Sequence, residues 1–302
     1  MITSRASLWP AVGLAILFVS VIAPTSYSQQ TAASGARPDP SLRVGLESIY
    51  NAWRQATLTA NVAEWERWTA YSRQVETRNR IVSQRLPFPQ AFFEDPIAPP
   101  PLGGLISLGV LTTGQTATST YFGKANFGGA EDGFIPDNIL VLHFLNEDGL
   151  WKFDTLRVVK LGNDADLLLQ IQNADFSFLR GEEFQPAAKL PPVAQPVNPP
   201  EFLAEAWIDS TGYETAIKVN GHPTGTFSNI KTSELIIGGL RRGQNTIEIT
   251  IKSIELAPQD SAARRFELAV YAAKDASSEA NRVFHLPAGT TITPVMTHQF
   301  VV

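Results

Sequence analysis

The feature that most constrains the fold is the stretch of residues 138–161, near the middle of the 302-residue chain. It reads Asn-Ile-Leu-Val-Leu-His-Phe-Leu, then Asn-Glu-Asp-Gly, then Leu-Trp-Lys-Phe-Asp-Thr-Leu-Arg-Val-Val-Lys-Leu. β-Branched and aromatic residues dominate both runs, and the central Asn, Asp and Gly accept the positive φ angles of a tight reversal. The stretch therefore predicts a β-hairpin, and the helical patterns that precede it need a sheet to cover.

Length and charge set the broad class of the chain. A chain of 302 residues suits two domains of ordinary size, each able to bury a core. With 24 Lys and Arg against 29 Asp and Glu, the net charge is -5, which disfavours nucleic acid as a partner because phosphate binding needs a concentrated basic surface. Cysteine is absent, so a thiol nucleophile, a disulfide framework and a cysteine metal site are excluded. We expect no cofactor.

The amino terminus has the three parts of a secretory signal. Arg5 precedes an apolar run over residues 8–23, and the small residues Ser26 and Ser28 follow at the positions that a signal peptidase reads. We expect cleavage after Ser28 and export to the periplasm or the extracellular space of a bacterium. The alternative is an uncleaved membrane anchor, but the run is shorter than the roughly 20 residues that span a bilayer.

Residues 29–40 consist mainly of small and polar residues with two prolines, and we expect them to form a disordered tether. A first domain over residues 41–185 then begins with apolar residues at helical spacing up to Trp53. Asn61 and Glu64 resemble a capping box and predict the start of a second helix. We expect its Trp65, Trp68 and Tyr71 to be core residues, and its interleaved arginines and glutamates to form a solvated face.

Strands follow the helices. The proline-rich residues 96–104 predict an irregular crossing. Short β-rich runs come next. A glycine-rich loop at residues 123–133 lies between two of these runs. Because no helix begins after this loop, a hairpin connection is favoured over a phosphate-binding loop. The predicted strands are residues 105–113, 116–122, 138–145 and 150–161.

The first domain resembles the NTF2-like family, the cone fold of SnoaL-type cyclases and ketosteroid isomerases, over residues 42–183. The resemblance is carried by Tyr-Asn-Ala-Trp at 50–53, by the break Thr-Ala-Asn at 59–61, and by Glu-Asp-Gly-Leu-Trp-Lys-Phe at 147–153. It implies an α+β cone with a curved antiparallel sheet, which can enclose a pocket or form a homodimer through that sheet. The long second helix and the proline-rich insertion at 87–101 depart from compact members of the family.

Chemistry inside such a cone needs a carboxylate or imidazole on the inner wall. Alternation places His143 on one face of its strand with Val141 and Leu145, and Asp154 lies on the facing strand. His143 and Asp154 are thus the candidate catalytic dyad. The alternative is a structural or solvent-facing histidine, which is the commoner case for a lone His in a sheet. The four histidines are scattered and no metal-ligand motif occurs, so we expect no metal site.

The proline-rich residues 186–200 cannot form a helix and predict a semi-rigid linker. Beyond it, residues 201–302 carry short alternating strands with no helix between them, which predicts an all-β sandwich domain. The strands are expected at 202–209, 214–219, 233–237, 245–254 and 265–272, with one or two closing strands in the tail at 281–302.

This second domain resembles the galactose-binding-like jelly roll over residues 202–273. The carriers are Ala-Ile-Lys-Val-Asn-Gly at 216–221, Gly-Thr-Phe at 225–227 and Gly-Leu-Arg-Arg-Gly-Gln-Asn-Thr-Ile-Glu-Ile at 239–249, whose glycines and asparagines make turns. Sugar binding in such a module would need exposed aromatic side chains. The candidates are Trp207, Tyr213 and Phe227, with Tyr271 beside them, and each can equally be a core residue.

Three functions fit these features. The chain is an exported non-catalytic binding or scaffold protein, or an enzyme with His143 as acid or base in the cone, or part of a larger envelope assembly. The lack of a convergent polar set favours the binding protein and the envelope assembly over the enzyme. The expected partners are a small molecule, a glycan or an envelope protein, with no nucleic acid and no membrane span once the signal is cleaved.

Overall fold

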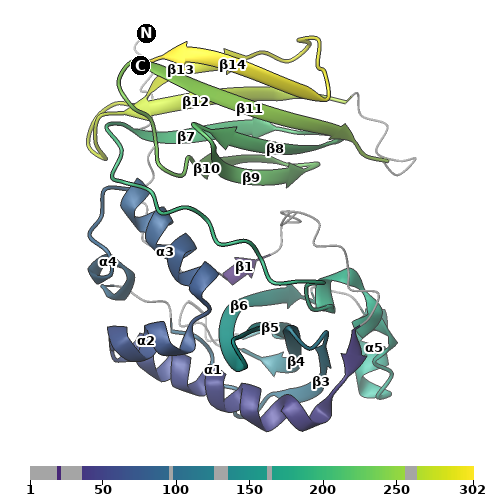
Figure 1. Ribbon diagram of the computed structural model, residues 1–302. Coiled ribbons are helices and arrows are strands. Elements are labelled where there is room, and N and C mark those ends of the chain that lie inside the picture. Colours follow the sequence, from purple (N-terminus) through teal and green to yellow (C-terminus); the bar gives the residue numbers. More distant parts are fainter. Residues whose placement is uncertain (1–18, 22–35, 95–97, 126–134, 162–164, 256–263) are drawn as a thin grey trace.

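A computed structural model describes residues 19–21, 36–94, 98–125, 135–161, 165–255 and 264–302 (Figure 1). Two units lie one above the other in this view: an N-terminal unit of helices around one sheet, and a C-terminal unit of two sheets. The described part of the chain is mostly β-structure with some helix. Within that part, no helix is both long and apolar enough to cross a membrane.

The N-terminal unit is built on a mainly antiparallel sheet in the order β1-β6-β5-β4-β3-β2. The predicted hairpin is confirmed, because β5 and β6 pair along their length and turn at Asp148 (φ 53°) and Gly149 (φ 85°). The glycine-rich loop between β4 and β5 falls largely outside the described residues. The strands are β1 (Val19–Val21), β2 (Arg37–Pro38), β3 (Ile106–Thr112), β4 (Thr116–Lys124), β5 (Asp137–Glu147) and β6 (Leu150–Lys160).

The two edge strands come from segments for which no strand was predicted. Of the predicted signal, residues 1–28, only β1 is described, and it pairs in parallel with β6 at Leu156 to Val158. The rest of that segment and residues 29–35 of the predicted tether lie outside the described residues. Residues 36–40 are ordered rather than part of a disordered tether, because β2 pairs with β3 and Asp39 donates its N–H to the Val110 carbonyl at 3.0 Å.

Helix α1 (Arg43–Leu58) covers one face of the sheet with the apolar residues that the sequence pattern predicted. Tyr50 and Trp53 pack on Phe153 of β6, with ring centroids 5.4 and 4.1 Å away. Trp65 is also buried, as predicted, among three phenylalanines that include those of the short helix α4 (Gln90–Phe93). Aromatic packing therefore fills the space between the helices and this face of the sheet.

The prediction of one continuous second helix is wrong. Helix α2 (Val62–Trp68) ends at Thr69, which forms a bridge with Phe153, and the Ala70 N–H donates to the Phe153 carbonyl at 2.8 Å. A new helix, α3 (Tyr71–Ser83), then leaves the sheet at a different angle (Figure 1). Tyr71 consequently lies on the surface, 54% exposed, and is not part of the core.

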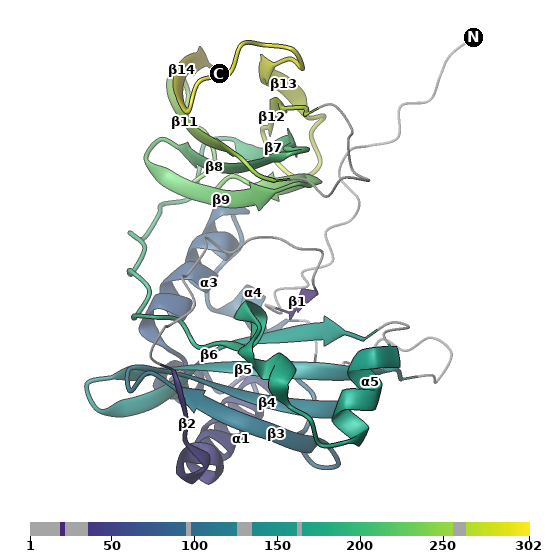
Figure 2. The same ribbon diagram turned by 90° about the vertical axis from the view of Figure 1, so that its right-hand side faces the viewer.

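The prediction of a solvated face of arginines and glutamates on this segment is correct for Glu66 and Arg67 of α2, which are exposed, but wrong for Arg73 of α3, which is buried. Figures 1 and 2 place α3 between the two units, where its polar side chains bind the rest of the protein. Arg80 pairs with Glu234 at 2.9 Å, and Arg85 donates to the carbonyls of Pro200 and Lys274 at 2.7 and 2.6 Å. Arg85 lies two residues beyond the end of α3, and its several N–H donors bind backbone carbonyls of both the connecting segment and the C-terminal unit.

Asn79 holds the connecting segment 186–200 against α3. Its side chain is 2% exposed, donates to the Gln195 carbonyl at 2.8 Å and accepts from the Val197 N–H at 3.0 Å. Ser83 adds a direct bond to the C-terminal unit by accepting from the Gly238 N–H at 2.7 Å. The proline-rich segment is thus extended, as predicted, and is anchored to the helix on one side.

The other face of the sheet packs on a helix that the sequence analysis missed. No helix was predicted in this part of the sequence, but α5 (Ala165–Gln172) contributes Ile171 to a second apolar cluster. The short helical turns η2 (Ser177–Arg180) and η3 (Glu182–Phe184) complete this cluster with Leu179 and Phe184.

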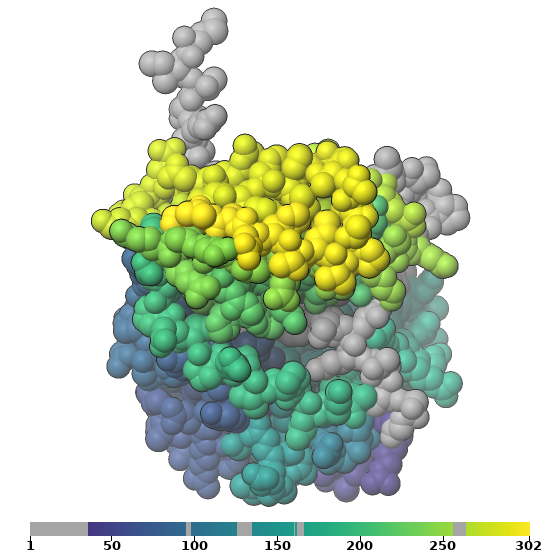
Figure 3. All heavy atoms as spheres, turned by 45° about the horizontal axis from the view of Figure 1, so that its top comes forward, coloured from purple at the N-terminus to yellow at the C-terminus, as the bar shows by residue number. Residues whose placement is uncertain are grey.

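The C-terminal unit consists of two four-stranded antiparallel sheets, in the orders β10-β7-β12-β13 and β14-β11-β8-β9. Both sheets contribute to one core cluster, and Figure 2 shows them side by side. The tail forms two strands, which cover the outer end of the molecule in yellow (Figure 3). The strands are β7 (Leu203–Asp209), β8 (Tyr213–Val219), β9 (His222–Ser228), β10 (Lys231–Leu235), β11 (Gln244–Ser253), β12 (Glu267–Ala273), β13 (Asn281–Leu286) and β14 (Val295–Val301).

The turn residues of this unit act structurally. Asn220 (φ 51°) and Gly221 (φ 84°) reverse the chain between β8 and β9, a strand that was not predicted. Asn245 is fully buried, accepts from the Asn220 side chain at 2.9 Å and donates to the Arg241 carbonyl at 2.8 Å. The asparagines therefore tie neighbouring turns together.

The interface on α3 can be tested with Asn79→Ala. This change leaves the N–H of Val197 and the carbonyl of Gln195 without a partner, so we expect the free energy of unfolding to fall by about 1–3 kcal/mol. Chemical denaturation measures this change. Arg67→Ala, which removes an exposed ion pair on α2, is the control and should change stability by less than about 0.5 kcal/mol. Equal effects of the two substitutions would contradict this account of the interface.

Candidate functional site

The predicted dyad residues lie close together on the sheet, but no hydrogen bond joins them. A bulge in the β5–β6 pairing sets His143 opposite Thr155 and Phe144 opposite Phe153, so Asp154 is the extra residue of the bulge. The Asp154 carboxylate binds Arg73 Nε at 3.1 Å, and Arg73 in turn contacts Glu76 at 2.6 Å. Asp154 is therefore engaged by α3 rather than by the imidazole.

Burial lowers the pKa of His143 to about 4, with Arg157 and Arg73 acting in the same direction against the opposing effect of Asp154. The imidazole is consequently neutral at pH 7. A neutral imidazole could accept a proton, yet a catalytic role needs an orienting partner within hydrogen-bond reach. The carboxylate that was predicted for this role is held by Arg73.

The three aromatic candidates of the C-terminal unit occupy different environments. Phe227 is 3% exposed and lies in the core cluster between the sheets, so it presents no surface to a ligand. Tyr213 is half-buried and packs against the same cluster. Trp207 is half-buried on the opposite side of β7, since its neighbours Ala206 and Ile208 point into the core. Trp207 thus belongs to the outer face of sheet β10-β7-β12-β13.

Strand register determines which residues meet on that outer face. One cross-strand row contains Ser233, Trp207, Ala269 and His285. The next row, two residues along, contains Leu235, Glu205, Tyr271 and Arg282. Neighbouring strands lie about 4.8 Å apart. The small Ala269 therefore leaves room beside Trp207.

A hollow of about 290 Å³ occupies this position, near the lower end of the range for small-ligand sites. Trp207 and Tyr271 supply aromatic surface, and the remaining side chains combine acceptors, donors and both signs of charge. We call this hollow the outer-face site. Its lining residues are Glu205, Trp207, Ser233, Glu267, Ala269, Tyr271, Ala280, Arg282 and His285.

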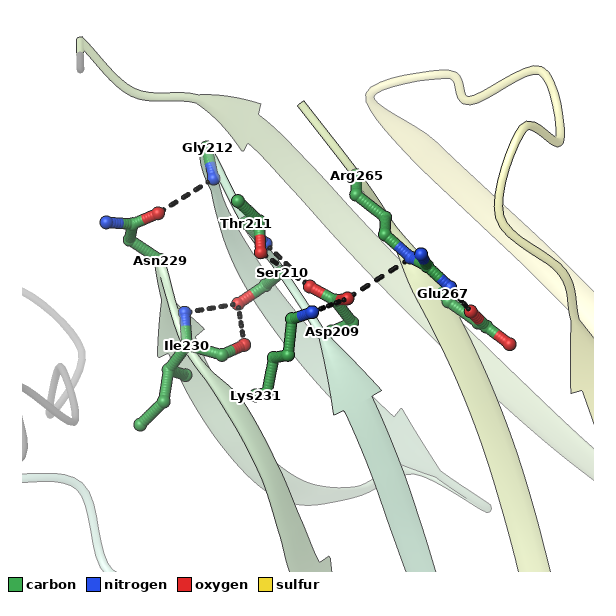
Figure 4. Close-up of polar contacts among 9 residues, drawn as sticks. All are labelled: Asp209, Ser210, Thr211, Gly212, Asn229, Ile230, Lys231, Arg265 and Glu267. Carbon is green, nitrogen blue, oxygen red and sulfur yellow. Dashed lines mark hydrogen bonds and ion pairs between the residues drawn. The ribbon is translucent and has the colours of Figure 1, made fainter. Parts of the chain in front are cut away.

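One end of the outer-face site adjoins a network of paired charges around Asp209 (Figure 4). The Asp209 side chain is 1% exposed, and its carboxylate contacts Lys231 Nζ at 3.0 Å and Arg265 Nε at 3.2 Å. Thr211 donates both its N–H and its hydroxyl to the same carboxylate. Burial alone would raise the pKa of Asp209, but the hydrogen bonds from Thr211 and Lys231 outweigh burial and hold it below its usual value.

Glu267 continues this network into the outer-face site. It accepts from Arg265 Nη2 at 2.6 Å and lies 3.0 Å from His285 Nε2. Hydrogen bonds from Arg265 and His285 lower the pKa of Glu267, so its carboxylate stays ionised at neutral pH. The negative charge of Glu267 is therefore already neutralised by Arg265 in the absence of a ligand.

Glu205 differs from these carboxylates. Among the residues that the structure describes, it has no hydrogen-bond or ion-pair partner, and burial together with the nearby Glu234 raises its pKa. Glu205 and Glu267 stand four residues apart along the strand direction, about 13 Å at 3.3 Å per residue. Paired carboxylates that hydrolyse glycosides stand about 5–9.5 Å apart, so the arrangement favours binding over hydrolysis.

Trp207 and Tyr271 of this site were predicted from the sequence as candidate ligand-binding residues, but the polar groups around them were not. The signal was present in Glu-Ala-Trp-Ile-Asp at 205–209 and Glu-Leu-Ala-Val-Tyr at 267–271, which alternate in the same way. Only the pairing of these two strands brings their polar and aromatic positions to one face. Across the described ranges, no group of three or more His, Asp or Glu side chains is placed to hold a metal ion.

The Asp209 network predicts a dependence of stability on pH. The pKa of Asp209 is lower in the folded chain than its usual value near 4, so the ionised carboxylate stabilises the fold above that pH and this contribution is lost as the pH falls through the folded value. We expect Asp209→Asn to cost about 1–3 kcal/mol at pH 7 and less at pH 3. Denaturation curves at both pH values test this, with Glu248→Gln, an exposed carboxylate of β11, as the control. A difference that does not shrink in acid would contradict it.

Comparisons with known proteins identify no relative. No family model matches the chain, and no curated protein or solved structure matches it.

Proposed function

We propose that this protein is an exported, non-catalytic binding protein whose C-terminal unit holds a glycan at the outer-face site. The observation that carries the proposal is the hollow between Trp207 and Tyr271, two aromatic side chains that share a sheet face with ionised and hydrogen-bonding groups. Aromatic rings pack on the apolar faces of sugar rings, while the surrounding polar groups bind the hydroxyls.

We also propose that the two units are an NTF2-like domain and a galactose-binding-like domain. Two helices against a curved antiparallel sheet are in accord with an NTF2-like N-terminal domain, and two sheets over one core are in accord with a galactose-binding-like C-terminal domain. In the N-terminal unit, Tyr50, Trp53 and Phe153 fill the space under the helices. That packing supports a role for this unit as a platform that presents the C-terminal unit through α3.

Catalysis by the N-terminal unit has less support. His143 is neutral at pH 7, but Asp154, its predicted partner, is paired with Arg73. A scaffold role in an envelope assembly remains the alternative that needs no ligand in either unit.

Trp207→Ala tests the glycan proposal. The change removes aromatic surface from the outer-face site without entering the core, so we expect affinity for a bound oligosaccharide to fall about tenfold or more while the fold is retained. Calorimetric titration of residues 29–302 with a panel of oligosaccharides measures this. The control is Tyr71→Ala, an exposed aromatic residue on α3, which should leave affinity unchanged. Binding that is insensitive to Trp207→Ala would place the glycan elsewhere.

Export is tested separately. We expect the mature chain to begin at Gln29, because the signal pattern ends at Ser28. Expression of the full sequence in a bacterium, followed by fractionation and amino-terminal sequencing, determines this. A cell-associated protein that retains residues 1–28 would support the membrane-anchor alternative.

A further inference from the structure

The carboxylates around the outer-face site have cationic partners at one end of the site and none at the other. At the first end, Asp209 and Glu267 share Lys231, Arg265 and His285. At the second end lies Glu205, which has no partner among the described residues. A carboxylate that is partly removed from water without a counterion is costly, and natural proteins retain such groups mainly where they serve a ligand.

The groups near Glu205 come from three strands. Glu234 of β10 is opposite Ala206 in register and so belongs to the other face of the sheet, where it pairs with Arg80 of α3, but its negative charge still acts on Glu205. Tyr271 of β12 lies directly opposite Glu205, and Arg282 of β13 lies beyond Tyr271 in the same row. Arg282 is exposed and makes no ion pair with the carboxylate. Glu205 is therefore a carboxylate without a bound cation, and the surface beside it is aromatic, with Arg282 on the far side of Tyr271.

From this arrangement we propose that the outer-face site selects a cationic sugar, a saccharide with a free protonated amine, with Glu205 as the residue that binds the ammonium group. A carboxylate supplies the charge-assisted hydrogen bond, and the rings of Tyr271 and Trp207 add cation–π attraction while packing on the sugar ring. An N-acetylated sugar has no charge to offer Glu205 and would leave the carboxylate unpaired. This inference rests on the proposed glycan-binding function.

The affinity of the outer-face site for an amino sugar should depend on pH, because it depends on the charge of Glu205. Glu205 must be ionised to bind an ammonium group, and its pKa is raised in the free protein. Affinity for the amine should therefore rise as the pH increases through that value, and fall again when the amine itself loses its proton. Glu267 and His285 line the same site, but Glu267 is already ionised and paired with Arg265.

The test compares two ligands that differ only in acetylation: a glucosamine oligosaccharide and an N-acetylglucosamine oligosaccharide of equal length, with a neutral glucan as a third. Calorimetric titration at pH 6 uses residues 29–302. We expect the glucosamine oligomer to bind at least about tenfold more tightly than the acetylated one. Glu205→Gln should remove that preference, because binding of the glucosamine oligomer weakens when the carboxylate is lost.

The control variant is Glu248→Gln, which removes the same formal charge from an exposed position on the other sheet and should keep the preference. Glu205→Gln also has a signature without ligand. Because a raised folded-state pKa means that ionisation destabilises the fold, the variant should unfold at a higher temperature than the unmodified chain at pH 7, and this advantage should disappear at pH 4.

The outcomes separate the two proposals. Equal affinity for all three saccharides, lost with Trp207→Ala, would overturn the cationic-sugar inference and retain the glycan-binding function. An amine preference that Glu248→Gln reduces as much as Glu205→Gln would also overturn the inference, because long-range charge would then explain it. Failure of every saccharide to bind the folded chain would overturn both.

Discussion

The structure depends on one backbone contact between a helical segment and the central hairpin. The Phe153 carbonyl accepts the N–H of Ala70, and this interaction ends α2 where helical periodicity would otherwise continue. If the helix ran on, its arginines would point to solvent and its aromatic stripe would lie over the sheet. The break instead turns α3 away from the sheet and toward the connecting segment and the C-terminal unit.

This redirection explains an otherwise unfavourable distribution of polar groups. Arg73, Thr77, Asn79 and Ser83 lie on the buried side of α3, where unpaired polar atoms would cost free energy. Three of them find a partner in another element: Arg73 in Asp154 of β6, Asn79 in the backbone of the connecting segment, and Ser83 in Gly238, while Thr77 donates to the Arg73 carbonyl of its own helix. The helix therefore joins the units through directional bonds, which define their relative placement more narrowly than apolar packing alone would.

Alternation and turn chemistry make part of this fold predictable from the sequence. The Asp148–Gly149 reversal, most strands of both units apart from β1, β2 and β9, and the burial of Tyr50 and Trp53 follow from local patterns, because each pattern has one dominant physical solution. The division of the second helix and the burial of Asn79 do not, since both arise from partners distant in the chain. The same holds for the outer-face site. Trp207 could be predicted because it is an aromatic residue, whereas Glu205 becomes a candidate only once β7 is known to pair with β12.

The contrast between the two ends of the outer face connects stability to function. Asp209 is deeply buried, yet two cations and two donors from Thr211 compensate its desolvation, so the charge contributes to the fold. Glu205 has no such compensation, and hydrophobic residues such as the neighbouring Leu235 could occupy its position at lower cost. A chain selected for stability alone would pair or replace this carboxylate. Its retention beside two aromatic rings and a hollow is best explained if the missing counterion is supplied by a ligand.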